Sequence, residues 1–190
     1  MKSIYRTLAV LGAVLLASAP AHADKYSDTV KLFRNAGQSG EFFGKSYGYA
    51  VFPTIGKGGV GIGGAYGEGR AYVGGRYVGD TWMAQLSFGW QLGGEGYSQI
   101  IFFEDRRAFE EFSSGNFEFG ANVNAVAITA AASGTASTAG ASVGASGGKK
   151  DAATAGKYYK GMAVFTIAKG GLMYEASLSG QKYSYKAVGK

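Results

Sequence analysis

The sequence predicts a mainly β domain with accessory helices, built on a single glycine-rich antiparallel sheet or barrel-like structure. From Trp82 to Leu92, apolar residues at every second position alternate with Gln85, Ser87, Gly89 and Gln91, as expected of a strand with one buried face. Glycine supplies 33 of the 190 residues, which favours tight curvature and close contacts between strands. A strand-like element at Ala50–Gly59 also returns as Ala163–Gly171, without a counterpart of Pro53. The spacing of such segments predicts about eight to ten short strands.

The first 23 residues are typical of a secretory signal peptide. A basic start precedes an apolar run, Leu8–Ala17, which is short for a membrane span, and Ala21–Ala23 has the small-x-small pattern of a cleavage site. We therefore expect cleavage before Asp24 and export to the periplasm, to the outer membrane as an associated protein, or to the exterior. Residues 24–190 then have the length of one domain.

The composition of the expected mature chain excludes several chemistries. His22 is the only histidine and there is no cysteine, so cleavage would leave a chain with neither residue. Catalysis by Ser-His-Asp or Cys-His groups, structural zinc sites, haem held by histidine and iron–sulfur sites are then excluded. We expect a non-enzymatic protein without a cofactor or metal. The leader holds two basic residues and no acidic one, so the formal net charge falls from +6 to +4. This mild basicity suits an anionic lipid surface, and no nucleic-acid partner is expected.

Two helices are predicted beside the strands. Asp24–Ala36 has apolar residues at helical spacing and is ended by Gly37, and a further short helical turn is expected at Ser39–Phe43. The second helix, Asp105–Phe112, lies in mid-chain, where opposite charges four residues apart indicate a solvated face.

The strands are expected on both sides of the mid-chain helix. The pattern before it predicts a hairpin that turns at Gly67–Gly69, and a central strand at Tyr97–Phe103 that is apolar on both faces. After it, alternation resumes at Phe117–Ala125 and again at Leu172–Leu178. A low-complexity Ala/Ser/Thr/Gly segment covers about residues 130–156 and could be a close-packed strand pair or a mobile loop.

Several motifs occur together in this chain: Gly-Tyr-Ala-Val-Phe-Pro, Lys-Gly-Gly, a glycine ladder, Gly-Trp-Gln-Leu-Gly-Gly, and a late Ala-Val-Phe followed by Lys-Gly. They lie at Gly48–Pro53, Lys57–Gly59, Gly61–Gly69, Gly89–Gly94, Ala163–Phe165 and Lys169–Gly170. In this combination, from about Ala36 to the end, the chain resembles the SYLF domain family. The resemblance implies a β-rich domain that binds anionic phospholipids, with phosphoinositide ligands in eukaryotic members and an actin link in yeast members.

Two departures narrow what the resemblance implies. The segment after Phe119 is an Ala/Ser/Thr/Gly run, and the basic amphipathic helix that binds phosphoinositides in animal members has no clear match; Asp24–Ala36 is only a similar kind of helix. An exported bacterial chain would meet neither actin nor phosphoinositides. The expected partner is therefore the anionic phospholipid of a membrane surface.

The two copies of the repeated element supply the first candidates for phosphate binding. These candidates are Lys57, Gly58, Gly59, Lys169, Gly170 and Gly171. Backbone N–H groups of a glycine turn beside a lysine can bind phosphate, whereas turn lysines also serve simply to keep strand ends soluble. The order of residues differs from that of a nucleotide-binding P-loop.

The first helix supplies the remaining candidates, Lys25, Lys31 and Arg34. Its basic residues could hold the helix on an anionic bilayer, each contributing about 1 kcal/mol near the surface. Alternatively, its apolar residues pack on the sheet and the charges face solvent. The leading prediction is a lipid-binding protein of the cell envelope. The alternative is a structural or interaction protein whose Ala130–Gly148 tract mediates assembly.

Overall fold

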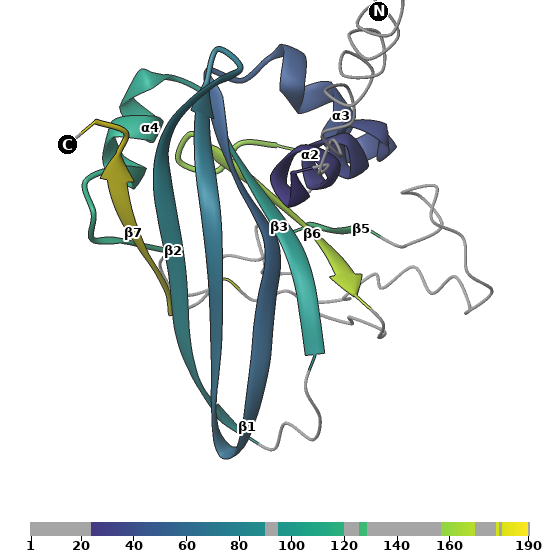
Figure 1. The fold of residues 1–190 in the computed structure, drawn as a ribbon, viewed down its shortest axis with the longest axis vertical. Coiled ribbons are helices and arrows are strands. Elements are labelled where there is room, and N and C mark those ends of the chain that lie inside the picture. Colours follow the sequence, from purple (N-terminus) through teal and green to yellow (C-terminus); the bar gives the residue numbers. More distant parts are fainter. Residues whose placement is uncertain are drawn as a thin grey trace, which may run out of the picture.

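The computed structural model describes residues 24–89, 95–119, 126–128, 157–169, 178 and 180–189. Its strands form one seven-stranded sheet in the order β4-β7-β2-β1-β3-β6-β5, in which every neighbouring pair is antiparallel except β5 with β6. The strands are β1 (Gly48–Val73), β2 (Arg76–Gly89), β3 (Glu95–Phe103), β4 (Phe117–Glu118), β5 (Val126–Ile128), β6 (Met162–Lys169) and β7 (Gln181–Ala187). The sheet curls into a half-barrel, so the predicted mainly β, barrel-like fold is confirmed (Figure 1).

Short helices lie around one end of this sheet. They are α2 (Lys25–Asn35), α3 (Gly37–Gly40), the 3-10 helix η1 (Glu41–Gly44) and α4 (Arg106–Phe112). Figure 1 shows α2 and α3 together on one side and α4 on the other, while β1 and β2 extend well beyond them. The N-terminal helix and the mid-chain helix were both predicted, and each is capped at its start by an aspartate side chain.

The long ribbon β1 folds back on itself. Its residues 48–57 pair with β3 and its residues 61–73 pair with β2, each in antiparallel register. Gly69 lies against Phe52 and Gly67 against Ile55, which centres the reversal on residues 60–61. The chain then turns from β1 into β2 at residues 74–75, where both glycines have positive φ, of 56° and 75°.

The predicted hairpin turn at Gly67–Gly69 is therefore wrong, because these glycines lie inside a strand. A Cβ at Gly67 would come within 2.5 Å of Ile55 Cγ1, and one at Gly69 within 2.6 Å of Phe52 Cε1. The two positions need glycine so that large side chains of the other arm of β1 can lie across them, not because the chain turns there.

The two faces of the sheet carry two separate apolar clusters. Phe52 of β1 contacts Tyr183 of β7 although β2 lies between these strands, so their face is the inner face of the curl. The outer face bears Val51, Ile100 and Phe165, which pack with α2 and η1. The half-barrel thus has an inner core and an outer core, and the strands that are apolar on both faces, such as β3, serve both. The prediction that Tyr97–Phe103 forms a central strand is confirmed.

The two copies of the repeated element lie on β1 and β6, on either side of β3. The extra residue of the first copy, Pro53, is accommodated in a bulge between Phe52 and Ile55, where the carbonyl of Pro53 accepts a hydrogen bond of 2.8 Å from Ser98 Oγ. Ala50 of the first copy corresponds to Ala163 of the second. However, Ala50 pairs with the same β3 residue, Ile101, as Val164, which is one position further along the second copy. Equivalent residues of the copies therefore face opposite sides of the sheet.

Some predicted segments lie outside the described residues. These are the low-complexity segment at about 130–156, most of Leu172–Leu178, and part of Phe117–Ala125.

Candidate functional site

The helix α2 rests on the outer face of the sheet. Tyr26 and Phe33 are buried, with exposed fractions of 6% and 0%, and they pack with outer-face residues of β1, β3 and β6. Of the two interpretations left open for this helix, docking on the sheet is the one the structure shows. Its apolar side is covered by the domain, so only its polar sides face outward.

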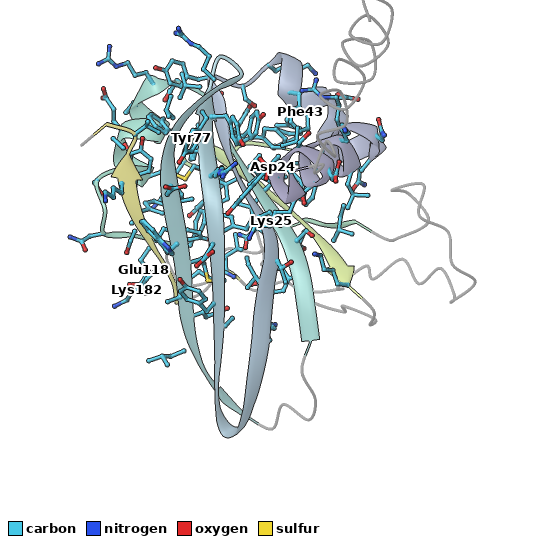
Figure 2. The ribbon with its side chains drawn as sticks, in the orientation of Figure 1. Asp24, Lys25, Phe43, Tyr77, Glu118 and Lys182 are labelled. Atoms are coloured by element: carbon cyan, nitrogen blue, oxygen red, sulfur yellow. The ribbon has the colours of Figure 1, made fainter. Side chains whose placement is uncertain are left out.

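An ion pair fixes the start of α2. Asp24, the N-cap residue, accepts a hydrogen bond of 2.7 Å from Arg70 Nη1 of β1 and a longer one of 3.4 Å from the backbone N–H of Tyr26. The guanidinium carbon of Arg70 also lies 4.2 Å from the centre of the Tyr26 ring. The carboxylate of Asp24 is therefore engaged by Arg70, and Figure 2 shows Asp24 and Lys25 at this end of the helix.

Lys169, the last residue of β6, reaches across β3 towards β1. Its register partner on β3 is Gly96, and the Lys169 Cβ lies 3.9 Å from where a Cβ at Gly96 would be. Because Gly96 has no side chain, Lys169 can pass over it, and its Nζ donates a hydrogen bond of 2.7 Å to Thr54 Oγ1 in the bulge of β1. The bulge thus holds the ammonium group in one place.

Lys25 and Lys169 lie close enough for the charge of Lys25 to act on Lys169. Partial burial, and secondly the charge of Lys25, lower the pKa of Lys169 from its ordinary value of 10.5. Lys25 Nζ lies 5.2 Å from the centre of the Tyr26 ring. Among the residues that the structure describes, neither lysine has a carboxylate within ion-pair distance. We call these two residues, with Thr54, the Lys25–Lys169 corner.

The other basic residues of α2 do not join this corner. Lys31 forms an exposed ion pair of 3.3 Å with Asp28, and the Arg34 guanidinium lies 4.3 Å from the centre of the Phe43 ring. At about 100° per residue, Lys31 and Arg34 lie only about 60° apart on one side of the helix, whereas Lys25 points about 120° or more away from both. The three candidates of the first helix are therefore not one basic stripe.

Lys57 lies on the opposite face of the sheet from Lys169. It shares a face with Ile55, and its Nζ is 5.6 Å from the centre of the inner-face Tyr97 ring. Of its neighbours, Gly58 and Gly59 belong to β1 near its reversal, whereas Gly170 and Gly171 lie outside the described residues. The two lysines of the repeat therefore cannot contact one phosphate. The structure instead brings Lys25 close to Lys169. These residues are 144 positions apart, and the sequence alone did not indicate that they would meet.

A buried polar network, which the sequence also did not indicate, occupies the inner face. Gln99 Nε2 donates to Tyr183 OH and to Gln181 Oε1, at 3.0 and 3.2 Å, and Gln181 Nε2 donates to Tyr97 OH at 3.1 Å. Burial raises the pKa of Tyr97 and of Tyr183, so both phenols stay protonated. At the surface, a hydrogen bond to Asp80 raises the pKa of Tyr77 to about 12. These shifts run opposite to those of a nucleophile or general base that works near neutral pH.

The described residues include neither a metal-binding cluster nor a membrane-spanning helix. No group of three or more carboxylate or imidazole side chains is placed to hold a metal ion in the described part of the chain. Nor is any of its helices long and apolar enough to cross a membrane.

Comparison with known proteins gives the family. Residues 84–187, from β2 to β7, match the model of the Ysc84 family, described as Las17-binding protein actin regulator. The chain belongs to this family, whose domain is the SYLF domain. SYLF domains are binding domains, and membership indicates a role in binding lipid or actin. The match includes Lys169 but not Lys25 or the rest of α2.

A curated relative of this SYLF protein is beta cell expansion factor A of Aeromonas veronii. The two are 31% identical over 156 residues, which cover 81% of this chain and 51% of the relative. The chain therefore spans about half the length of that protein.

Proposed function

We propose that this chain is a non-enzymatic binding protein of the cell envelope, and that it takes the phosphate of an anionic phospholipid headgroup at the Lys25–Lys169 corner. The observation that supports this proposal is the pair of lysines, neither of which has a carboxylate within ion-pair distance among the described residues. Two cations close enough to lower the pKa of one of them repel each other, and an anion bound between them would relieve that repulsion.

The surroundings of the corner favour an anion from outside the chain. Asp24 is the nearest acid in sequence to Lys25, but Arg70 already engages it. Lys169 is held by Thr54 at the end of β6, so the ammonium group is positioned before a ligand arrives. The start of α2 adds the positive end of a helix dipole beside Lys25.

Of the two ligand classes that the family indicates, lipid is the better suited to an exported chain. The leader predicts export of the chain from the cytoplasm, where actin is found. Phospholipid membranes, by contrast, are present in the envelope itself. Binding would be peripheral, through phosphate contacts at the corner.

The proposal is tested by sedimentation with vesicles of anionic and of neutral phospholipid. We expect the protein to sediment with anionic vesicles only. The double variant Lys25→Ala/Lys169→Ala should bind them roughly 25-fold more weakly, because each basic residue contributes about 1 kcal/mol near the surface.

The matched control is Lys31→Ala/Arg34→Ala, which removes two charges from the same helix but leaves the corner intact. Equal and negligible sedimentation with both kinds of vesicle would overturn the proposal of lipid binding. Equal losses in the two double variants would overturn the assignment to the Lys25–Lys169 corner.

A further inference from the structure

A groove crosses the outer face of the sheet over β1, β2, β7 and β4. Tyr66, Ala84, Lys182 and Glu118 are paired in register across β1, β2, β7 and β4, and all four line the groove. They alternate with inner-face residues such as Tyr183, so their row lies on the outer face. The groove has a volume of about 610 Å³, within the range of small-molecule sites. Three strand spacings of about 4.8 Å make this row about 14 Å long.

Two glycines keep the groove open, although their backbone conformations do not require glycine. Gly56 and Gly64 both line it and neither has a positive φ. A Cβ at Gly56 would meet nothing within 4 Å, and one at Gly64 would meet only the carbonyl oxygen of Gln85 at an ordinary 3.4 Å. This differs from Gly67 and Gly69, where a Cβ would collide with core side chains. At Gly56 and Gly64, what a side chain would fill is the groove itself.

The walls of the groove are apolar and unusually exposed. Leu86, the register partner of Gly64, is 76% exposed, and Tyr66 is 54% exposed. They are two of the three most exposed large apolar side chains among the described residues. Exposed apolar side chains that line one depression are typical of a ligand site.

One end of the groove carries two opposite charges. Lys182 Nζ lies 3.6 Å from Glu118 Oε2, and both side chains are largely exposed. Figure 2 shows them side by side at β7, well apart from Lys25. An exposed ion pair of this kind contributes little to stability, so either charge can pair with a ligand at small cost.

We propose that this groove binds a single-chain zwitterionic amphiphile of the lysophospholipid class. The acyl chain lies over Gly56 and Gly64 between the walls formed by Tyr66 and Leu86. The phosphate of the head pairs with Lys182 and its ammonium with Glu118, so both charges of the ion pair are matched. An added β-strand is a poorer occupant, because most of the groove crosses β1, β2 and β7, which pair with a strand on each side, and only Glu118 belongs to the edge strand β4.

This site borders the Lys25–Lys169 corner, because Gly56 is the register partner of Gly96, over which Lys169 passes, but it differs from the corner in ligand. The corner would contact a bilayer surface, whereas the groove would hold one amphiphile molecule removed from a bilayer. Either assignment can fail without the other.

The test is calorimetric titration of the full chain with lysophosphatidylethanolamine below its micelle concentration. We expect saturable binding of one molecule per chain. Glycerophosphoethanolamine, the same head without a chain, and a fatty acid of the same chain length, which lacks the ammonium group, should each bind at least roughly tenfold more weakly. Absence of saturable binding would overturn the proposal, and equal binding of the fatty acid would overturn the role of the charged pair.

Variants locate the ligand. Gly56→Leu fills the groove and should weaken binding by roughly tenfold or more. Its matched control is Gly44→Leu, at a glycine of η1 where a Cβ also meets nothing within 4 Å. Equal affinity in both variants, with thermal unfolding unchanged, would overturn the assignment to this groove. Lys182→Gln and Glu118→Gln should each weaken binding of the zwitterion, and Glu118→Gln should leave the weak fatty-acid binding unreduced.

Discussion

Phe52 of β1 and Tyr183 of β7 meet at a ring-centre distance of 5.7 Å on the inner face, although the sheet order places β2 between their strands. This contact closes the half-barrel around its core. It is possible because Gly69 of the returning arm of β1 lies under the Phe52 ring and has no side chain of its own. The curl of the sheet, and with it the separation of an inner and an outer face, depends on such contacts.

Phe52→Ala should therefore destabilise the protein strongly. The side chain is fully buried and its loss leaves a cavity next to Tyr183, so we expect the free energy of unfolding to fall by about 3–5 kcal/mol. Denaturant unfolding followed by circular dichroism measures this change. A loss below about 1 kcal/mol would show that the contact does not close the core.

Gly67→Ala should destabilise the fold, whereas Gly56→Ala should not. At Gly67 the new methyl group would lie 2.5 Å from Ile55 Cγ1 and 3.0 Å from the Thr54 carbonyl oxygen, which requires the backbone to move and costs about 1–3 kcal/mol. At Gly56 the methyl group meets nothing within 4 Å. Thermal unfolding of the two variants makes the comparison, and similar melting temperatures would contradict it.

Asp24→Ala should loosen the start of α2. The change removes the N-cap and the ion pair with Arg70, for an expected loss of about 1–2 kcal/mol. Hydrogen exchange of the α2 backbone amides is the direct measurement. Asp28→Ala is the control, since Asp28 only pairs with exposed Lys31; equally faster exchange in both variants would argue against an anchor at Arg70.

Binding to anionic vesicles should weaken with rising pH earlier than an ordinary lysine predicts. The pKa of Lys169 is lowered from 10.5, so this group loses its charge at a lower pH than a lysine of ordinary pKa would. Because the charged form binds phosphate, affinity falls as pH rises through the lowered pKa. Sedimentation over a pH series measures it, and the same profile in Lys169→Ala would contradict the assignment.

The lowered pKa of Lys169 also predicts how this residue affects the stability of the fold. A lysine whose pKa is lower in the folded state than in the unfolded state destabilises the fold while it is charged, and this penalty disappears as pH rises above the unfolded value. Lys169→Gln removes the charge but keeps a polar group at the end of the side chain. It should therefore unfold at a slightly higher temperature than the parent protein at neutral pH.

The sequence was sufficient for the fold class and for most elements. Alternation in β2 and the apolar runs of β3 and β6 correctly predicted strands, but the alternating apolar face of β2 is not the buried one: Leu86 is 76% exposed, whereas Met83 on the other face is fully buried. The helices were placed to within one or two residues. The prediction of turns from the sequence failed because glycine occurs both in turns and inside closely packed strands. Glycine at residues 67 and 69 looks like a turn in sequence, but the actual turn at residues 74–75 has the same composition, and only the packing of Phe52 and Ile55 separates the two cases.

The candidate site was less predictable because proximity across a sheet depends on register. Lys169 was identified from its sequence, but its partnership with Lys25 depends on where α2 docks, and its contact with Thr54 depends on the bulge at Pro53. The groove residues Tyr66, Leu86 and Lys182 gave no motif, since they come together only when β1, β2 and β7 are aligned.

The bulge at Pro53 has a consequence for the internal duplication. Deletion of Pro53 would give both copies the same length, yet it would not bring Lys57 and Lys169 to one face. The bulge absorbs the extra residue, so Phe52 and Ile55 stay on one side just as Phe165 and Ile167 do on the other. The opposition of the copies is set earlier, by the one-residue offset with which they meet β3. The duplicated element therefore supplies apolar side chains to both faces of one sheet from a single sequence pattern. Insertion or loss of the proline does not alter which face each copy serves.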